Sequence, residues 1–174
     1  MKGAACIVPL LLLAARAGAP AQPPPAAAAA ATVFPPASRP APADGFELRM
    51  RRGACYGRCP VYEVVLHADG AVDYHGDGGT RHGRADAAGF AALRQRLADP
   101  DLPWGDYTRA APAACGAWAT DMPGVSIDAY LGGRWRSIRH DLGCSAAPAA
   151  LKALEQQIDD AAGSRRWSGG REVE

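Results

Sequence analysis

Two cysteines four residues apart restrict this chain more than any other part of its sequence. Cys55 and Cys59 enclose residues 56–58, and Pro60 follows them directly. Proline has no backbone N–H to donate to a sheet, so Pro60 predicts that a strand begins immediately after the cysteine pair. Residues 52–60 are therefore expected to form a loop between two strands.

The first 21 residues are typical of a secretory signal peptide. Lys2 is followed by an apolar run over residues 4–15 and then by small residues up to Ala21. The run is too short to cross a membrane, so we expect cleavage near Ala21, with an uncleaved anchor as the alternative. The protein is then exported to the periplasm or the extracellular space, and Cys6 is lost with the signal.

Composition divides the rest of the chain. Residues 22–44 are mostly proline and alanine and predict a disordered spacer, because they combine helix breakers with little apolar bulk. Residues 45–168 suffice for a single domain, and residues 169–174 are expected to be a flexible tail. The formal net charge of +1 gives no indication of a nucleic-acid partner, and no membrane span is expected after signal cleavage.

Four cysteines remain after signal cleavage, namely Cys55, Cys59, Cys115 and Cys144. An even number in an exported chain predicts disulfides, and four cysteines allow three pairings. We favour structural bonds from Cys55 to Cys59 and from Cys115 to Cys144. The alternative for the first pair is thiol redox activity, because a neighbouring arginine favours the reactive thiolate.

Alternating apolar residues predict strands on both sides of the cysteine pair. Apolar residues alternate with charged ones over residues 46–51, and a hairpin is expected over residues 61–76. A three-residue loop at residues 68–70 places the apolar residues of both hairpin strands on one face. This register sets Leu66 opposite Val72.

The second half of the chain predicts two helices and a second hairpin. Asp86 can cap one helix, and Ser145 can cap a last helix near residues 147–162. Between them, residues 104–124 are expected to form a loop and residues 125–141 a hairpin. The predicted fold class is α+β, with an antiparallel sheet of hairpins and two helices packed on one face.

The polar face of the first hairpin carries a candidate metal site. The chosen register places Glu63 opposite His75, and a turn at residues 78–79 would place His75 opposite His82. Two histidines and one carboxylate at such spacing can hold a transition metal. The alternative is an ordinary solvated hairpin face, for which no cofactor is expected.

The region around the cysteine pair resembles a known family. Besides the two cysteines, the shared pattern consists of Arg52, Tyr56, Gly57, Pro60, Tyr62, Asp69, Gly70, Tyr74 and Asp121. It is similar to a bacterial exported family termed domain of unknown function 6438, over roughly residues 46–167. The resemblance implies a fold and an exported location, and it implies no activity, cofactor or catalytic residue. Cys115 and Cys144 lie outside the pattern.

Arg52 and Asp121 both belong to this pattern, and we expect an ion pair between them that fixes the loop against the sheet. No nucleophile with a base and an orienting group can be assembled from spacing. The sequence favours a non-enzymatic binding or structural module, exported and stabilised by disulfides, whose partner is an unidentified envelope protein or ligand. The alternative is a thiol-redox or metal-binding periplasmic protein that uses the cysteine pair or the Glu63, His75 and His82 cluster.

Overall fold

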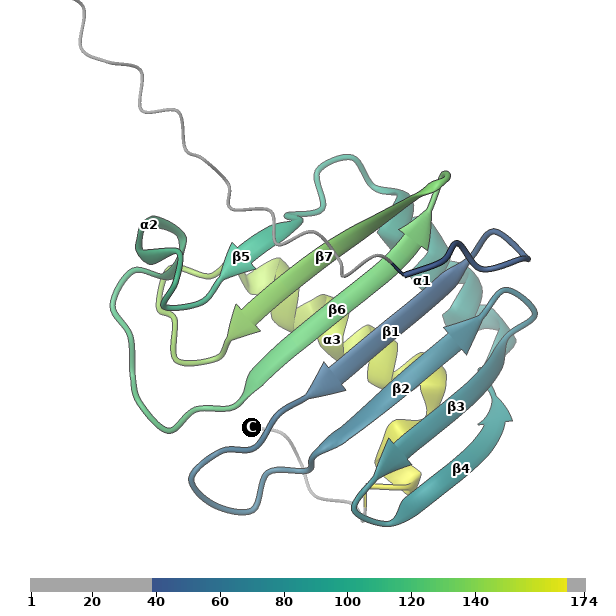
Figure 1. The fold of residues 1–174 in the computed structure, drawn as a ribbon, viewed down its shortest axis with the longest axis horizontal. Coiled ribbons are helices and arrows are strands. Elements are labelled where there is room, and N and C mark those ends of the chain that lie inside the picture. The colour runs from purple at the N-terminus through teal and green to yellow at the C-terminus, as the bar shows by residue number, and fades with distance from the viewer. Residues whose placement is uncertain (1–38, 169–174) are drawn as a thin grey trace, which may run out of the picture. The chain divides into compact units, whose positions relative to one another are not determined.

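A computed structural model describes residues 39–168 of the chain (Figure 1). The predicted signal peptide, most of the predicted spacer and the predicted tail lie outside these residues. Seven strands form one sheet in the order β4-β3-β2-β1-β6-β7-β5. Neighbouring strands are antiparallel, except that β5 and β7 are parallel.

The strand β1 (Glu47–Arg52) lies between β2 (Tyr62–His67) and β6 (Gly124–Leu131). The alternation of buried and less buried residues extends one residue beyond the predicted range of 46–51. Arg52 is therefore the last residue of the strand and is buried like Leu48 and Met50, so the loop begins only after it.

The first hairpin has the predicted register. β3 (Ala71–Gly76) pairs with β2 so that Leu66 lies opposite Val72, and the loop consists of residues 68–70. Gly70 has a φ of 81° there, a conformation that glycine adopts without the steric cost of a side chain. The three-residue loop is thus confirmed.

The turn between β3 and β4 (Gly79–Arg84) was predicted wrongly. Residues 77–78 make it, because Gly76 pairs with Gly79. The whole of β4 is consequently shifted relative to the predicted register, and His82 lies opposite Asp73 instead of His75.

The second hairpin joins β6 to β7 (Arg134–Asp141) at two glycines, as expected. The segment before it is not a plain loop. It contains the three-residue strand β5 (Gly105–Tyr107), which pairs with β7, and the four-residue helix α2 (Pro112–Cys115). Both elements are too short to leave a periodic pattern in the sequence.

Two longer helices complete the fold. α1 (Ala87–Ala98) begins at Asp86, whose side chain accepts a hydrogen bond from the Gly89 N–H over 2.7 Å, as predicted. α3 (Ala149–Ala162) ends at Gly163 and is followed by the short 3-10 helix η1 (Ser164–Arg166).

The predicted cap of the last helix was wrong. Pro148 occupies the N-cap position of α3, and the backbone N–H of Ser145 instead donates to the carbonyl of Ala117 over 2.9 Å. The pairing of this segment with the loop before β6 overrides the capping preference of serine.

One apolar core joins the sheet to α1 and α3. Its fully buried members include Leu48, Met50, Leu66, Leu93, Leu97, Ile127, Ile138, Leu151, Leu154 and Ile158. In the view of Figure 1, α3 runs behind the sheet. The α+β class is confirmed, with a mostly antiparallel sheet and three α-helices.

Candidate binding surface at the cross-linked end of the sheet

Both predicted disulfides are present. Cys55 and Cys59 are joined within the β1–β2 loop with their Cα atoms 5.7 Å apart. Cys115 and Cys144 join the end of α2 to the segment after β7 with their Cα atoms 4.5 Å apart. The second bond is buried, whereas the first is half-buried, so the two bonds differ in their access to solvent.

Backbone hydrogen bonds join the β1–β2 loop to the first residue of β6 and to the segment before it. The N–H of Gly53 donates to the carbonyl of Gly124 over 2.8 Å, and the N–H of Tyr56 donates to the carbonyl of Asp121 over 3.0 Å. Asp121 has a φ of 67°, a conformation uncommon for a residue with a side chain. The two loops therefore form one bonded unit.

Trp118 holds the second loop against the end of β7. Its Nε1 donates to Oδ2 of Asp141 over 2.7 Å, and its backbone forms an isolated bridge with Cys144. The guanidinium of Arg109 lies 4.7 Å from the centre of the indole ring. These contacts add to the restraint that the buried disulfide places on this loop.

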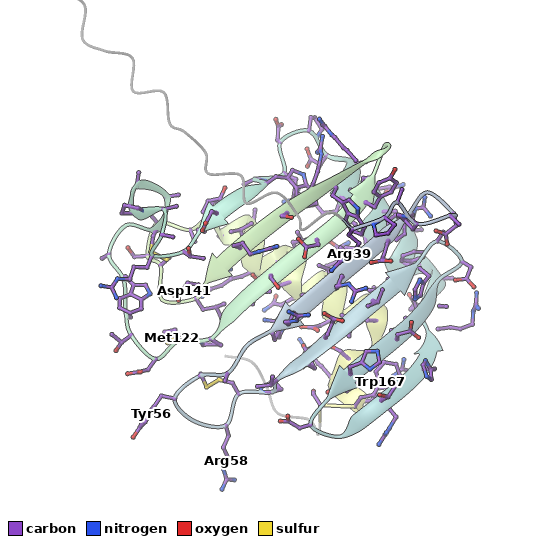
Figure 2. The ribbon with its side chains drawn as sticks, viewed as in Figure 1. Arg39, Tyr56, Arg58, Met122, Asp141 and Trp167 are labelled. Carbon is purple, nitrogen blue, oxygen red and sulfur yellow. A yellow bond between two sulfur atoms is a disulfide. The ribbon has the colours of Figure 1, made fainter. Side chains whose placement is uncertain are left out.

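Four large apolar residues are exposed among residues 39–168, namely Tyr56, Val61, Trp118 and Met122. All four belong to the two joined loops, and we call them the apolar end surface. Tyr56 is 89% exposed and Met122 is 43% exposed. Figure 2 shows both side chains pointing outward from the same end of the sheet.

Arg52 does not pair with Asp121, so that prediction was wrong. The side chain of Arg52 turns to the buried face, where its Nε and Nη2 donate to Oδ2 of Asp159 over 3.0 and 2.7 Å. Its Nη1 lies 3.5 Å from Oε2 of Glu155. Asp121 is exposed in the loop before β6, where Thr120 donates a hydrogen bond to its carboxylate.

Three further groups complete this buried polar network. The hydroxyl groups of Tyr62 and Ser164 each donate to Oδ1 of Asp159 over 2.5 Å. Nδ1 of His140 lies 2.6 Å from Oε1 of Glu155, within hydrogen-bond distance. The network connects α3 and η1 to β1, β2 and β7.

The network holds its central members in defined charge states. Burial lowers the pKa of Arg52, but Asp159, Tyr62 and Glu155 together more than offset that effect, so the pKa is raised and the guanidinium stays charged. Burial, and next the charge of Asp159, raises the pKa of Tyr62 far above its ordinary value. These groups bind one another through hydrogen bonds and ion pairs, which indicates a structural role.

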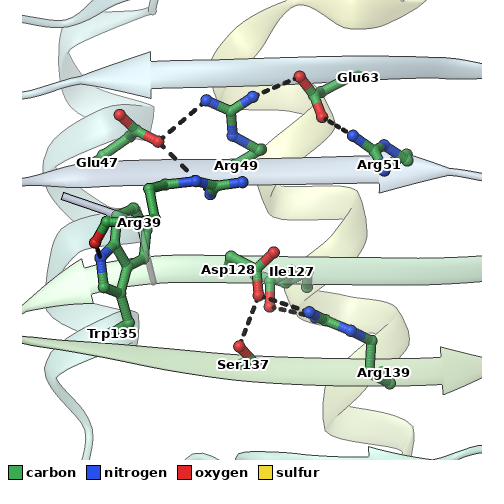
Figure 3. Close-up of polar contacts among 10 residues, drawn as sticks. All are labelled: Arg39, Glu47, Arg49, Arg51, Glu63, Ile127, Asp128, Trp135, Ser137 and Arg139. Carbon is green, nitrogen blue, oxygen red and sulfur yellow. Dashed lines mark hydrogen bonds and ion pairs between the residues drawn. The ribbon is translucent and has the colours of Figure 1, made fainter. Parts of the chain in front are cut away.

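The predicted metal cluster does not form. His82 lies opposite Asp73, and its Nδ1 is 2.7 Å from Oδ1 of that residue. Glu63 does lie opposite His75, but its carboxylate oxygens accept hydrogen bonds of 2.7 and 2.6 Å from two arginines of β1 (Figure 3). Within the described part of the chain, no group of three or more His, Cys, Asp or Glu residues could hold a metal ion.

Paired charges cover the same face of the sheet further along (Figure 3). Oδ1 of Asp128 accepts hydrogen bonds from Ser137 over 2.6 Å and from Arg139 over 2.9 Å. Nε1 of Trp135 donates to the carbonyl of Arg39 over 3.1 Å. Because Arg39 belongs to the predicted spacer, the last residues of that segment contact the sheet.

Other residues of the sequence pattern shape the first hairpin. The rings of Tyr62 and Tyr74 stack with their centres 5.4 Å apart. A Cβ atom at Gly76 would lie 2.5 Å from the hydroxyl oxygen of Tyr74 and 2.9 Å from Cβ of Tyr62. Asp69 accepts a hydrogen bond from the Ala71 N–H over 2.8 Å and so stabilises the loop.

The seven-stranded sheet, its helices and the two cross-linked loops define a small disulfide-bonded α+β domain. The chain belongs to the family described as domain of unknown function (DUF6438), whose model matches residues 46–162. That range contains the four disulfide-bonded cysteines and the Arg52–Asp159 pair. No curated protein matches the chain. Across residues 39–168, no helix is long and apolar enough to cross a membrane.

Proposed function

We propose that this protein is an exported, non-enzymatic binding module whose contact surface is the apolar end surface. The proposal includes a signal peptide at residues 1–21, a spacer at residues 22–44, one domain at residues 45–168 and a flexible tail at residues 169–174. It also includes the packing of both long helices on one face of the sheet. The signal peptide then directs the chain to the envelope space, where its partner resides.

The observation that carries the proposal is the position of the exposed apolar side chains. Within residues 39–168, all the large ones belong to the two loops that backbone hydrogen bonds join at one end of the sheet. Exposed apolar groups that cluster in this way are typical of interaction sites. Tyrosine, tryptophan and methionine are also enriched in the cores of protein interfaces.

The restraint of these loops supports the same interpretation. A loop that becomes ordered on binding loses conformational entropy, which weakens the complex. Here the two disulfides and the Tyr56–Asp121 hydrogen bond already hold the loops in place. A partner therefore meets a surface that is largely preformed.

The charges around the apolar end surface indicate the chemistry of the partner. Arg58 and Arg109 are exposed in or beside the two loops, where the exposed carboxylate of Asp121 is an opposing charge. The fitting partner is an envelope protein that presents an aromatic or aliphatic group ringed by carboxylates. Complementary charge at the rim raises the association rate and excludes cationic surfaces.

Binding to envelope extract tests the proposal when matched variants are used. We expect the immobilised wild-type chain to retain a defined component, and the double variant Tyr56→Ser/Met122→Ser to retain at least about tenfold less of it, because central interface residues dominate affinity. The variant Arg134→Ser changes an exposed residue of the second hairpin and serves as the control. Equal retention by all three chains would refute the proposed surface.

Cell fractionation tests export separately. We expect the mature chain in the periplasmic or extracellular fraction with its N-terminus at Gln22. A chain that keeps Met1 and stays in the cytosol would contradict the export of the protein.

Thiol–disulfide exchange at Cys55 and Cys59 is the second candidate function. It is favoured by the half-buried position of this bond in an exposed loop next to Arg58. A measured reduction potential decides between the two roles. A value near about −200 mV would support exchange, whereas a value below about −300 mV supports a structural bond.

A further inference from the structure

The edge of the sheet formed by β4 lies apart from the apolar end surface. β4 is the first strand in the sheet order, so among the strands of residues 39–168 it pairs only with β3. Five of its six residues are exposed, and Gly83 is half-buried. The opposite edge is the three-residue strand β5, so β4 is the longer open edge of the sheet.

The backbone of β4 presents alternate residues to the open side. Gly76 and Gly79 close the two-residue turn, and the N–H of Ala85 donates inward to the carbonyl of Gly70 over 2.9 Å. Hydrogen-bonded pairs alternate along an antiparallel ladder. The backbone groups of the even-numbered residues 80, 82 and 84 are therefore directed away from β3, where they can receive another strand.

One of these outward groups has a partner. The carbonyl of Thr80 accepts a hydrogen bond from Nη1 of Arg81 over 2.9 Å. The described residues form no hydrogen bond to the outward backbone groups of His82 and Arg84. The centre and the far end of β4 thus offer two N–H donors and two carbonyl acceptors.

The side chains of β4 make this edge cationic. The strand carries Arg81, His82 and Arg84 and no carboxylate. Two acidic residues lie nearby, because His82 contacts Asp73 and the guanidinium of Arg84 lies 3.7 Å from Asp69. Arg84 nevertheless keeps 69% of its side chain exposed.

The other face of the edge is aromatic. A Cβ atom at Gly83 would lie 3.0 Å from the ring of Trp167, so this glycine leaves space that the half-buried ring fills. A strand added beside β4 would place alternate side chains on the two faces of the sheet. One set would meet the side chains of His82 and Arg84, and the other would lie near Trp167 on the face that also carries Arg81.

We propose that β4 is a docking site for an extended segment of a partner protein that alternates acidic and apolar residues. The segment adds to the sheet as an eighth strand through the outward backbone groups of His82 and Arg84. Main-chain hydrogen bonds provide affinity in this binding mode, and the side chains provide specificity. Its carboxylates lie on the face of Arg84 and its apolar residues on the face of Trp167.

Titration with a synthetic peptide tests this inference. The probe is the heptapeptide Glu-Val-Glu-Ile-Glu-Val-Glu, added to the full mature chain at low salt, and the matched peptide has lysine at every glutamate position. We expect the acidic peptide to bind with a Kd below about 100 μM and the lysine peptide at least about tenfold more weakly. Failure of the acidic peptide to bind up to about 1 mM would overturn the proposal.

Two variants locate the site. His82→Pro removes a backbone N–H that points away from β3 and leaves the N–H groups that pair with β3 in place, and edge strands tolerate such a change. It should weaken binding of the acidic peptide at least about tenfold relative to His82→Ala. Arg84→Glu should reverse the preference toward the lysine peptide, whereas Arg134→Glu should change nothing. Equal binding by His82→Pro and His82→Ala, or an unchanged preference in Arg84→Glu, would contradict the site.

Two further measurements separate this site from other interactions. Tyr56→Ser/Met122→Ser should bind the acidic peptide as the wild type does, because the apolar end surface is not involved. Analytical ultracentrifugation should show that the chain does not self-associate through β4. His82→Pro should therefore leave its association state unchanged. Such self-association would mean that a second copy of the chain occupies the edge, which would overturn the proposed partner.

Discussion

Arg52 and Asp159 lie 107 residues apart in the sequence and share two hydrogen bonds of 3.0 and 2.7 Å in the buried side of the fold. Arg52 is the last residue of β1, directly before the cysteine loop. The pair therefore fastens the end of α3 to the base of the loop that carries Tyr56. We infer that this pair positions the loop that carries Tyr56 and so supports the apolar end surface.

Replacing Arg52 should destabilise the protein strongly. Arg52→Ala leaves Asp159 and Glu155 buried without their cation, which costs about 3–5 kcal/mol in comparable buried pairs. Urea unfolding should show a loss of free energy of that size. A loss of less than about 1 kcal/mol would contradict the role given to the pair.

A double-mutant cycle should show which carboxylate Arg52 contacts. We expect Arg52→Ala and Asp159→Ala to couple by more than about 1 kcal/mol, because they remove the same interaction. Arg52→Ala and Asp121→Ala should be additive within about 0.5 kcal/mol. Coupling between Arg52→Ala and Asp121→Ala, with additivity between Arg52→Ala and Asp159→Ala, would instead support an ion pair between Arg52 and Asp121.

Tyr62 should make the protein less stable at alkaline pH. The pKa of its hydroxyl is raised in the folded state above its ordinary value of 10.0, so the unfolded chain releases this proton first. The contribution of Tyr62 is fully present below pH 10 or so and is lost as the pH rises further. The free energy of unfolding should therefore fall less steeply above that pH in Tyr62→Phe, and identical slopes would count against the buried network.

The two disulfides should differ in their contribution to stability and in their reactivity toward a reductant. The sequence separations of 29 and 4 residues predict how far each double variant lowers the free energy of unfolding. The decrease should be about 3–4 kcal/mol for Cys115→Ala/Cys144→Ala and about 2 kcal/mol for Cys55→Ala/Cys59→Ala. Under mild reduction, alkylation followed by mass spectrometry should label the half-buried pair Cys55 and Cys59 first. Earlier labelling of the buried pair would contradict the structure.

Gly76 should not tolerate alanine. The added methyl group would collide with Tyr74 and Tyr62, and overpacking of this kind costs about 1–3 kcal/mol. Gly124→Ala is the matched control, because the nearest atom to its Cβ would be 3.8 Å away. Thermal unfolding should show a clear decrease in Tm for Gly76→Ala only. Equal decreases in Tm for both variants would disprove the close packing of the two tyrosines.

Local patterns predicted much of this fold. The register of the first hairpin follows from the single arrangement that places its apolar residues on one face, and Leu66 does lie opposite Val72. The turn after β3 could not be predicted in the same way. Residues 77–79 offer more than one two-residue turn, and β4 carries no large apolar side chain that selects a register.

The buried network was missed for a different reason. Arg52 continues the alternation of β1, and Glu155 and Asp159 stand four residues apart on the buried face of α3. These spacings were a usable signal, but charged residues are rarely buried, so the pattern favoured exposure. Only the tertiary structure brings the two segments together.

Site-specific photocrosslinking tests the central claim most directly. A photoreactive phenylalanine derivative replaces Tyr56 in the full chain, and a second chain carries it at position 134 as the control. We expect irradiated cells to yield one discrete adduct in the exported fraction from position 56 and none from position 134. No adduct from position 56, or the same adduct from both positions, would contradict an exported module that binds through the apolar end surface.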